Sequence, residues 1–272
     1  MSASQTHKLG FIGAGKLAGS VIRGLMRAKF CAPEKIIASE PNEQTRAALE
    51  KETRVSVTAE NAEVAEKADV IFIGVKPGMV VGVLRDLAPR IDNKLVISLA
   101  GGVRIASMEK AAHARFMRAL TNTPSAICQA ATGITRGSRS TNEDVDLARK
   151  IFGIIGVVVE VDESQIDIIT ALSGSGPAFV YAIIDSLAAG GLKLGLPKNV
   201  SSGLAIQTVL GAAELMRESK MSAGDLIKMV VTPGGTTAAG LAVMEKMKTR
   251  ESLIAAVEAA TKRGQEMAKE NS

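Results

Sequence analysis

The sequence predicts an α/β domain followed by an all-helical domain, and three observations support this division. Short β-branched runs alternate with amphipathic stretches up to about residue 163. Beyond that point the strand signal disappears, and long apolar helical patterns occupy the rest of the 272 residues. Within the first part, residues 70–75 form a continuous apolar run, which is typical of a parallel-sheet strand buried between two helical layers. We therefore predict domains at residues 1–163 and 164–272.

Strands and helices alternate along the first domain. The predicted strands share aliphatic or β-branched side chains and cover Leu9–Gly13, Ile36–Ser39, Val55–Val57, Val70–Val75, Leu95–Leu99, Arg115–Ala119 and Val157–Val161. The predicted helices share an amphipathic spacing and cover Lys16–Ala28, Asn42–Lys51, Asn61–Ala68, Met79–Arg90, Ile105–Ala111 and Asn142–Phe152. The last of these begins at Thr141-Asn-Glu-Asp144, a capping-box pattern.

The second domain contains five predicted helices. Ser164-Gln-Ile-Asp167 has the capping-box pattern and should begin a long apolar helix that runs through Leu192. Pro197 suits the first turn of the next helix, which runs to about Glu218. The third helix begins at Ser222-Ala-Gly-Asp225, and the last two cover Thr236–Met247 and Glu251–Ala268. Few charges cover these apolar helices, so we expect this domain to form a dimer.

The composition argues against several classes of function. The net charge is +5, but no basic run occurs and aromatic residues make up only 3%, which argues against nucleic-acid binding. The chain has two histidines and two widely separated cysteines, Cys31 and Cys128, so we expect no metal site, no Ser-His-Asp triad and free thiols.

We expect a soluble cytoplasmic protein that does not enter a membrane. Residues 1–8 have no apolar core that could serve as a signal peptide. The uncharged run that begins at Ile168 and ends at Ile184 contains Ser-Gly-Ser-Gly-Pro. It falls short of the roughly 20 apolar residues that span a bilayer.

A glycine-rich turn indicates that the first domain binds a dinucleotide. Residues 13–18, Gly-Ala-Gly-Lys-Leu-Ala, match the pattern GxGxxA between a predicted strand and a predicted helix. Gly13 suits the tight turn, Gly15 lets the backbone approach a pyrophosphate, and Ala18 permits close packing of the helix. The amides at the helix N-terminus would then face the phosphates. We predict a Rossmann-like domain whose cofactor-binding residues include Gly13, Ala14, Gly15, Lys16 and Leu17.

Glu40 follows the second predicted strand, where an acid can accept hydrogen bonds from both ribose hydroxyls of NAD and would repel a 2′-phosphate. The alternative is an exposed loop glutamate. Ser39, Asn42 and Arg46 lie close by and could receive a 2′-phosphate. Both NADH and NADPH therefore remain open as cofactors.

The positions of the two histidines argue against a histidine acid, because His7 lies in the N-terminal tail and His113 between a predicted helix and strand. The candidate is Thr232-Pro-Gly-Gly-Thr-Thr237, placed at the start of a helix. Several free N–H donors there could bind a small anion such as a carboxylate. Thr237 could donate a hydrogen bond beside the reacting carbon, although an ordinary capped loop is the alternative.

An ordered set of motifs resembles the pyrroline-5-carboxylate reductase family over nearly the whole chain. The motifs are GFIGAGKLA, GVKP (residues 74–77), TNTP (121–124), ALSGSGPAF (171–179), GGLKLGLP (190–197) and TPGGTT (232–237). The SGSGP and PGGTT segments discriminate the family much better than the nucleotide motif does. Thr232 stands where the family usually has Ser, a change that keeps the hydroxyl.

The resemblance implies hydride transfer from NADPH or NADH to Δ1-pyrroline-5-carboxylate, a cyclic imino acid, to give L-proline. It implies that the amides of Gly234, Gly235 and Thr236 hold the carboxylate and that Thr237 contacts the ring nitrogen. The dinucleotide and nicotinamide contacts that it implies are Asn61, Val75, Lys76, Pro77, Ala100 and Gly101. Family members form interlocked dimers, often assembled into decamers, in which each active site joins one subunit's nucleotide domain to its partner's helices.

Two alternatives compete with this interpretation. A β-hydroxyacid-type dehydrogenase shares the nucleotide domain and the helices, but its chemistry needs a catalytic lysine with an asparagine one turn later. Lys193 is followed by Pro197 at that spacing. A nucleotide-binding sensor or assembly protein without turnover is the other alternative, and it would not need the intact PGGTT segment.

Overall fold

The computed structural model describes residues 7–271 and confirms the expected order of an α/β part followed by helices. By internal contacts the described chain forms two compact units. The first contains the residues up to Ser175 together with those from Glu258 onward, and the second contains Gly176–Val257. The two units are described separately below.

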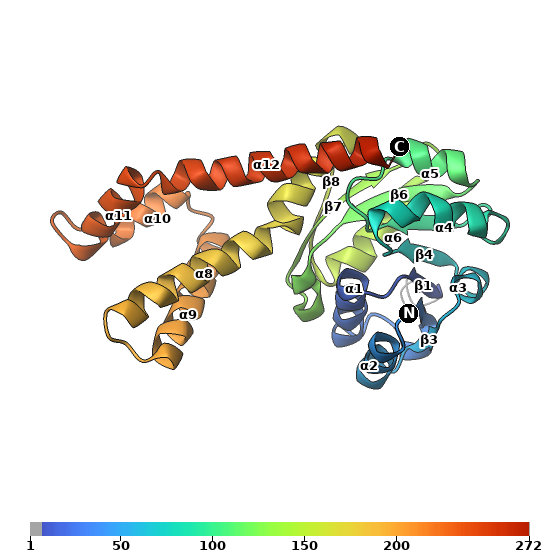
Figure 1. Ribbon diagram of the computed structural model, residues 1–272, viewed down its shortest axis with the longest axis horizontal. Helices are drawn as coiled ribbons and strands as arrows, with labels where there is room; N and C mark the ends of the chain where they lie inside the picture. The colour runs from blue at the N-terminus through green and yellow to red at the C-terminus, as the bar shows by residue number, and fades with distance from the viewer. Residues whose placement is uncertain (1–6, 272) are drawn as a thin grey trace. The chain divides into compact units, whose positions relative to one another are not determined.

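Within residues 7–271, eight strands form one sheet in the order β3-β2-β1-β4-β5-β6-β7-β8 (Figure 1). The strands are β1 (Leu9–Ile12), β2 (Ile36–Ser39), β3 (Ser56–Thr58), β4 (Val70–Ile73), β5 (Leu95–Ser98), β6 (Arg115–Leu120), β7 (Ala130–Arg136) and β8 (Gly156–Glu160). All neighbouring pairs are parallel except β6 and β7. In β1, Leu9 pairs with Ile36 of β2 and with Val70 of β4.

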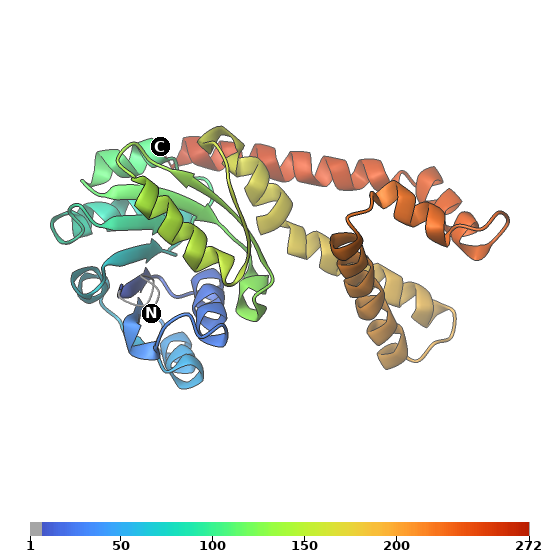
Figure 2. The same cartoon turned by 180° about the vertical axis from the view of Figure 1, so that it is seen from behind.

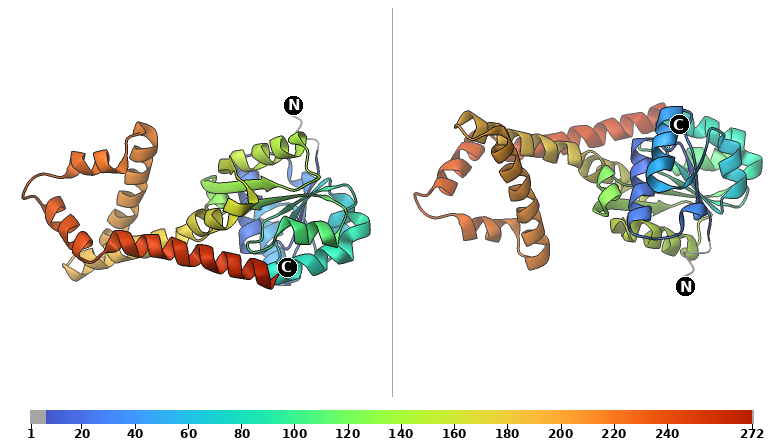
Figure 3. Two further views of the ribbon diagram at one scale, coloured as in Figure 1. Left: turned by 90° about the horizontal axis from the view of Figure 1, so that it is seen from above. Right: turned by 90° about the horizontal axis from the view of Figure 1, so that it is seen from below.

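Helices cover both faces of this sheet, as the edge views show (Figure 3). The helices of the first unit are α1 (Lys16–Arg27), α2 (Glu43–Thr53), α3 (Asn61–Lys67), α4 (Val80–Leu87), α5 (Ile105–Ala111), α6 (Asn142–Gly153) and α7 (Ile166–Ile169). Helices α1, α2 and α6 contribute to the core on one face, and α6 lies in front of the sheet in Figure 2. Helices α3, α4 and α5 contribute to the core on the other face.

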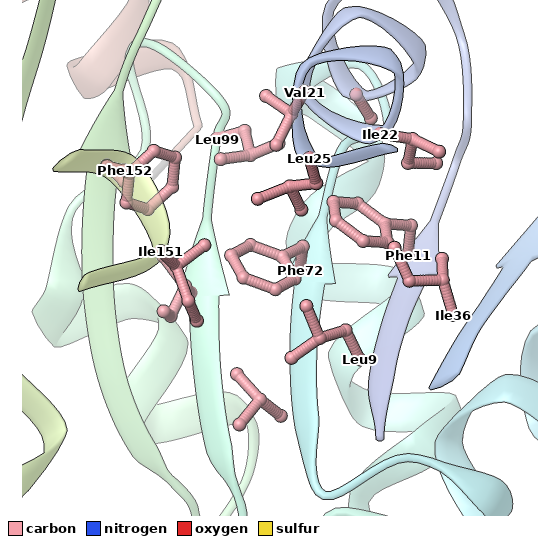
Figure 4. Packing of buried hydrophobic residues seen from close by; sticks show 14 of the residues in the cluster. Leu9, Phe11, Val21, Ile22, Leu25, Ile36, Phe72, Leu99, Ile151 and Phe152 are labelled. Atoms are coloured by element: carbon pink, nitrogen blue, oxygen red, sulfur yellow. The ribbon is translucent and has the colours of Figure 1, made fainter. Parts of the chain in front are cut away.

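Aromatic side chains bind α6 to the centre of the sheet (Figure 4). Phe11 of β1 stacks on Phe72 of β4 with ring centroids 4.5 Å apart. Phe152 of α6 meets Phe72 edge-on at 6.0 Å. Phe11, Phe72 and Phe152 are fully buried, so three of the few aromatic residues of this chain serve the core.

Strand β7 was not predicted from the sequence. Its residues, Ala-Ala-Thr-Gly-Ile-Thr-Arg, have small side chains and a central glycine, so the alternation typical of a strand is weak. Gly133 is needed because a Cβ there would lie 2.7 Å from Cγ2 of Ile169 in α7. The strand runs antiparallel to β6, so the sheet is mainly but not wholly parallel.

The predicted helix from Ser164 to Leu192 is interrupted in the structure. Its capping box lies two residues earlier than expected, between Asp162 and Gln165, and the N–H of Asp162 donates to Oε1 of Gln165 at 3.3 Å. A π turn, Thr170–Gly174 (η7), follows α7, and α8 (Gly176–Lys193) begins after it. The capping box at Thr141 and Asp144 is confirmed.

The second unit consists of helices, and α12 continues from it into the first unit. They are α8, α9 (Lys198–Ser219), α10 (Ala223–Val230), α11 (Thr236–Lys246) and α12 (Thr249–Glu270). Ser222 caps α10 by accepting the N–H of Asp225 at 3.1 Å, as its sequence predicts. Helix α9 begins directly after Pro197.

The two compact units do not divide the chain where the sequence pattern changes. The residues from Glu258 onward were expected in the second domain, yet they pack in the first unit. The side-chain amide of Asn271 donates to the carbonyl of Gly102 at 3.1 Å. The end of α12 therefore belongs to the packing of the α/β unit.

One helical run has the length and composition of a membrane span. The run Glu163–Lys193 is 31 residues long, and 17% of its most apolar window is buried. The uncharged run of residues 168–184 is shorter than a span, but the helical run that contains it is long enough, because α7, the π turn and α8 follow one another without a break longer than one residue.

Candidate active site

The carboxyl ends of four parallel strands lie at one edge of the sheet and bring several predicted site residues together. Strands β1, β2, β4 and β5 run parallel, so the loops that follow them share this edge. The order of strands along the sheet reverses between β1 and β4. Open α/β sheets bind ligands outside the carboxyl ends of strands at such a switch point.

Gly13 makes the tight turn after β1. Its φ is +84°, a conformation that L side chains rarely adopt. The N–H groups of Gly13 and Ala14 donate to the carbonyl of Ser39 at 3.1 and 2.8 Å. A Cβ at Gly13 would lie 2.8 Å from the backbone nitrogen of Val75, so only glycine fits here.

The N-terminus of α1 is open for an anion. Gly15 is its N-cap residue, and no side chain caps the helix. A Cβ on Gly15 would meet nothing within 4 Å. Ala18 is buried against the β4 loop, where a Cβ on Gly74 would lie 2.8 Å from that of Ala18. Free amides, open space and a close helix–strand contact are together what a bound pyrophosphate requires, so the residues present fit a dinucleotide.

The predicted ribose-binding residues gather at the end of β2. The hydroxyl of Ser39 donates to Oδ1 of Asn61 at 2.7 Å. Oε1 of Glu40 accepts the N–H of Asn42 at 3.1 Å. Nη1 of Arg46 donates to the carbonyl of Glu40 at 2.7 Å. Ser39 is fully buried whereas Glu40 is half-buried, so the carboxylate is the more accessible group at this corner.

The loops after β4 and β5 complete the same edge. Val75 borders the Gly13 turn, and the exposed Lys76 precedes a 3₁₀ turn, Pro77–Met79. After β5, Ala100 is buried and its N–H donates to Oγ of Ser98 at 3.3 Å. A Cβ on Gly101 would lie 3.4 Å from Cγ2 of Thr170 in the π turn.

In the second unit, Thr232–Thr237 forms a tight turn at the start of α11. Gly234 has a φ of +72°, and the N–H of Gly235 donates to the carbonyl of Thr232 at 2.9 Å. A Cβ on Gly235 would collide with the Thr232 hydroxyl. Gly235 is the N-cap of α11, and no side chain caps this helix, which leaves the first amides for an anion. Thr237 is half-exposed, with its hydroxyl one residue inside the helix.

A buried charge cluster lies beside the β5 loop, and the sequence assigned it no role. Arg118 of β6 is completely buried and pairs with Oε1 of Glu163 at 3.3 Å. Arg104 pairs with the buried Asp167 at 2.6 Å. Burial lowers the pKa of Arg118, and the negative charges of Glu163 and Asp167 oppose this effect. Arg118, which lies among apolar residues inside β6, was the signal that could have revealed this cluster.

The structure thus collects the predicted residues into two sets. The set in the first unit contains the cofactor residues Gly13, Ala14, Gly15, Lys16, Leu17, Ser39, Glu40, Asn61, Val75, Lys76, Pro77, Ala100 and Gly101. The set in the second unit contains Thr232, Gly234, Gly235, Thr236 and Thr237. The sequence assigned no role to Thr170, which lies beside Gly101 of the first set, or to Asn122, which donates to the carbonyl of Ser173 in the same π turn as Thr170.

Comparisons with known proteins agree on one family. A family model described as pyrroline-5-carboxylate reductase dimerisation matches residues 163–267. A second model, described as NADP oxidoreductase coenzyme F420-dependent, matches residues 8–102. The two matched regions contain the second and first sets of site residues.

Curated relatives and a solved structure match almost the full chain. The pyrroline-5-carboxylate reductase of Pisum sativum is 40% identical over 266 residues, which cover 97% of both chains. That of Synechocystis is 40% identical over 264 residues, which cover 96% of this chain and 98% of the relative. The crystal structure of Plasmodium falciparum pyrroline carboxylate reductase with NADP bound has a TM-score of 0.91 at 30% identity, covering 98% of this chain and 100% of that one.

Proposed function

The chain belongs to the pyrroline-5-carboxylate reductase family, and from this premise we propose how its own residues perform the family's reaction. It is an NAD(P)H-dependent reductase of proline biosynthesis that converts Δ1-pyrroline-5-carboxylate to L-proline. Two uncapped glycine turns support the proposal: one begins α1 in the first unit, and the other begins α11 in the second. A dehydrogenase of the β-hydroxyacid type or a sensor without turnover would not account for this pair together with the family match.

The first unit binds the dinucleotide. The amides at the start of α1 face the pyrophosphate, while Glu40 and Asn61 face the ribose. Val75, Lys76 and Pro77 line the dinucleotide, and Ala100 and Gly101 lie beside the nicotinamide. When bound, NADH or NADPH supplies the hydride that reduces the C=N bond.

The turn before α11 binds the substrate. The amides of Gly234, Gly235 and Thr236 hold the carboxylate, and Thr232 braces the turn through its hydrogen bond with Gly235. The substrate reacts as the protonated imine, and the hydroxyl of Thr237 accepts a hydrogen bond from its ring N–H, which keeps the proton on the nitrogen and the imine carbon electrophilic. The ring nitrogen keeps this proton in the amine product.

Self-association follows from the dimerisation domain, and we further propose a dimer that assembles into a decamer. Large apolar side chains are exposed on several helices of the second unit, for example Leu187 (51%), Ile206 (53%), Met229 (64%) and Val243 (60%). We propose that a second copy of the chain, rather than lipid, covers them, and that the enzyme works in the cytoplasm. We propose that residues 1–163 serve dinucleotide binding and that residues 164–272 serve substrate binding and dimerisation.

The decisive experiment follows the oxidation of NADH and of NADPH in parallel, with pyrroline-5-carboxylate as the substrate. We expect consumption of at least one cofactor and the stoichiometric formation of proline. Binding of either cofactor without oxidation by any cyclic imino acid would instead support the sensor alternative.

A further inference from the structure

The π turn between α7 and α8 contains the backbone carbonyl of Ser173, and the residue four positions later has no N–H to donate to it. The N–H of Ser175 donates to the carbonyl of Thr170, five residues earlier, at 2.9 Å. In an α-helix the carbonyl of Ser173 would accept the N–H of residue 177, four residues later. Residue 177 is proline, which has no N–H. The Ser173 carbonyl therefore needs a donor from elsewhere in the fold.

Asn122 supplies that donor from the loop after β6. Its Nδ2 donates to the carbonyl of Ser173 at 3.0 Å. Its Oδ1 accepts the N–H of Ala131 in β7 at 3.2 Å. Asn122 is buried, with 7% of the residue exposed. One amide group thus joins the sheet to the π turn.

The π turn in turn lies against the loop that follows β5. Ile169, just before the turn, packs onto Gly133 of β7, where no side chain could be accommodated. Cγ2 of Thr170 lies 3.4 Å from the position that a Cβ on Gly101 would occupy. A shift of the π turn would therefore move the side chain of Thr170 that lies beside Gly101.

We propose that Asn122 is a positioning residue for the reductase reaction, acting through the π turn on the Gly101 loop. This inference rests on the proposed function, which places Ala100 and Gly101 beside the nicotinamide. Hydride transfer depends steeply on the placement of the reacting atoms, and an error of about 1 Å can cost on the order of 10²-fold in rate. Asn122 touches neither the cofactor nor the substrate in this proposal. Its loss should therefore lower kcat rather than weaken the binding of either molecule.

The variant Asn122→Asp tests this role because it keeps the acceptor for Ala131 but replaces the donor to Ser173 with an oxygen. We expect kcat to fall about tenfold or more, with both KM values changed less than about threefold. The matched control is Thr121→Val, which breaks the neighbouring buried hydroxyl pair between Thr121 and Thr132, 2.7 Å apart. This control should lower the Tm and leave kcat within about twofold, because it leaves the link to the π turn intact.

A second substitution distinguishes the Ser173 link from a general loss of packing. Pro177→Ala restores a backbone N–H that can donate to the Ser173 carbonyl. Added to Asn122→Asp, it should recover most of the lost kcat, while Pro177→Ala alone should remain near wild type.

The outcomes separate the two proposals. A wild-type enzyme that does not reduce pyrroline-5-carboxylate contradicts the proposed function itself. An active wild type overturns the role of Asn122 if Asn122→Asp keeps its kcat or loses only Tm as Thr121→Val does. The role is also overturned if Pro177→Ala fails to restore kcat. The single variant Asn122→Asp could fail to fold. In that case a double variant with Pro177→Ala that folds and turns over supports the link, and a double variant that also fails to fold overturns it.

Discussion

The hydroxyl of Ser39 donates to Oδ1 of Asn61 across 2.7 Å, joining the end of β2 to the first residue of α3. Ser39 is fully buried, so this hydrogen bond occupies a hydroxyl that could otherwise meet a 2′-phosphate. The accessible polar side chain at the end of β2 is that of Glu40, whose carboxylate accepts the N–H of Asn42. A carboxylate in this position favours ribose hydroxyls over a phosphate group.

Glu40→Ser should therefore shift the cofactor preference toward NADPH. We expect the ratio of kcat/KM for NADPH to that for NADH to rise about tenfold or more, because the repulsion of the 2′-phosphate is removed. Steady-state kinetics with both cofactors at fixed ionic strength measure this ratio. Glu43→Ser, on the exposed first turn of α2, is the control for a general change in charge. An unchanged ratio would mean that Glu40 does not meet the ribose.

Gly13→Ala and Gly15→Ala should have different effects, although both occur in the same motif. Gly13→Ala forces a side chain into a φ of +84° and against Val75, so we expect a loss of about 1–3 kcal/mol of stability together with weaker cofactor binding. Gly15→Ala adds a methyl group in open space, so it should leave the Tm unchanged and raise the Kd for NADH. Thermal denaturation and fluorescence titration measure the two effects. Tight NADH binding by Gly15→Ala would argue against a pyrophosphate at this turn.

Thr237→Ala should lower kcat by about 10²–10⁴-fold if the hydroxyl holds the proton at the ring nitrogen. If Thr237 only positions the ring, the loss should appear mainly in KM. Thr237→Ser keeps the hydroxyl and should recover most of the activity. Unchanged kinetics for Thr237→Ala would remove this residue from the mechanism.

Ile206→Asp should weaken self-association if a second copy covers the second unit. Ile206 is 53% exposed in the single chain, so a charge there costs little in a monomer but is unfavourable in an apolar interface. Sedimentation velocity across a range of concentrations should show a smaller species than wild type. Gln207→Glu on the same helix is the matched control, because it adds a charge at a residue that is already polar. A wild-type enzyme that is a stable monomer at nanomolar concentration contradicts the proposed assembly.

The Cys31 thiol should react slowly at neutral pH. Burial, and then the negative charge of Glu34, raise the pKa of Cys31 to about 11. Because the thiolate is the reactive form, alkylation at pH 8 should be about a hundredfold slower than in the unfolded chain. Because the pKa is raised, the alkylation rate should keep rising as the pH approaches 11. A Cys128→Ser background isolates the Cys31 thiol. A rate that levels off near pH 9 in the folded protein contradicts the shifted pKa.

The fold and the two glycine turns could be predicted from the sequence because their signals are local. Residues 13–18 specify a turn and a helix start within one short segment, and the strands around Phe11 and Phe72 are continuous apolar runs. Helix starts at Thr141 and Ser222 likewise depend on side chains three residues away. Such contacts need no knowledge of the distant chain.

The missed features depend on contacts between distant segments. Strand β7 has a weak pattern of its own, and it is stabilised by β6, β8 and the packing of Ile169 onto Gly133. The capping box lies at Asp162 and Gln165 rather than at the expected Ser164 and Asp167. The reason is that the carboxylate of Asp167 pairs with Arg104 instead of capping a helix. No local spacing reveals which of two acids will find a partner elsewhere.

The sequence alone thus determined the α/β class, the dinucleotide turn at Gly13 and the anion turn before Thr237, because each follows from short-range backbone chemistry. Only the tertiary structure decided that the hydroxyl of Ser39 is taken up by Asn61 and that Asn122 supplies the donor that Pro177 lacks. It also decided that Asn271 at the end of α12 packs beside Gly102. These hydrogen bonds join groups between 22 and 169 residues apart, and their formation depends on which buried polar groups remain to be satisfied once the chain has folded.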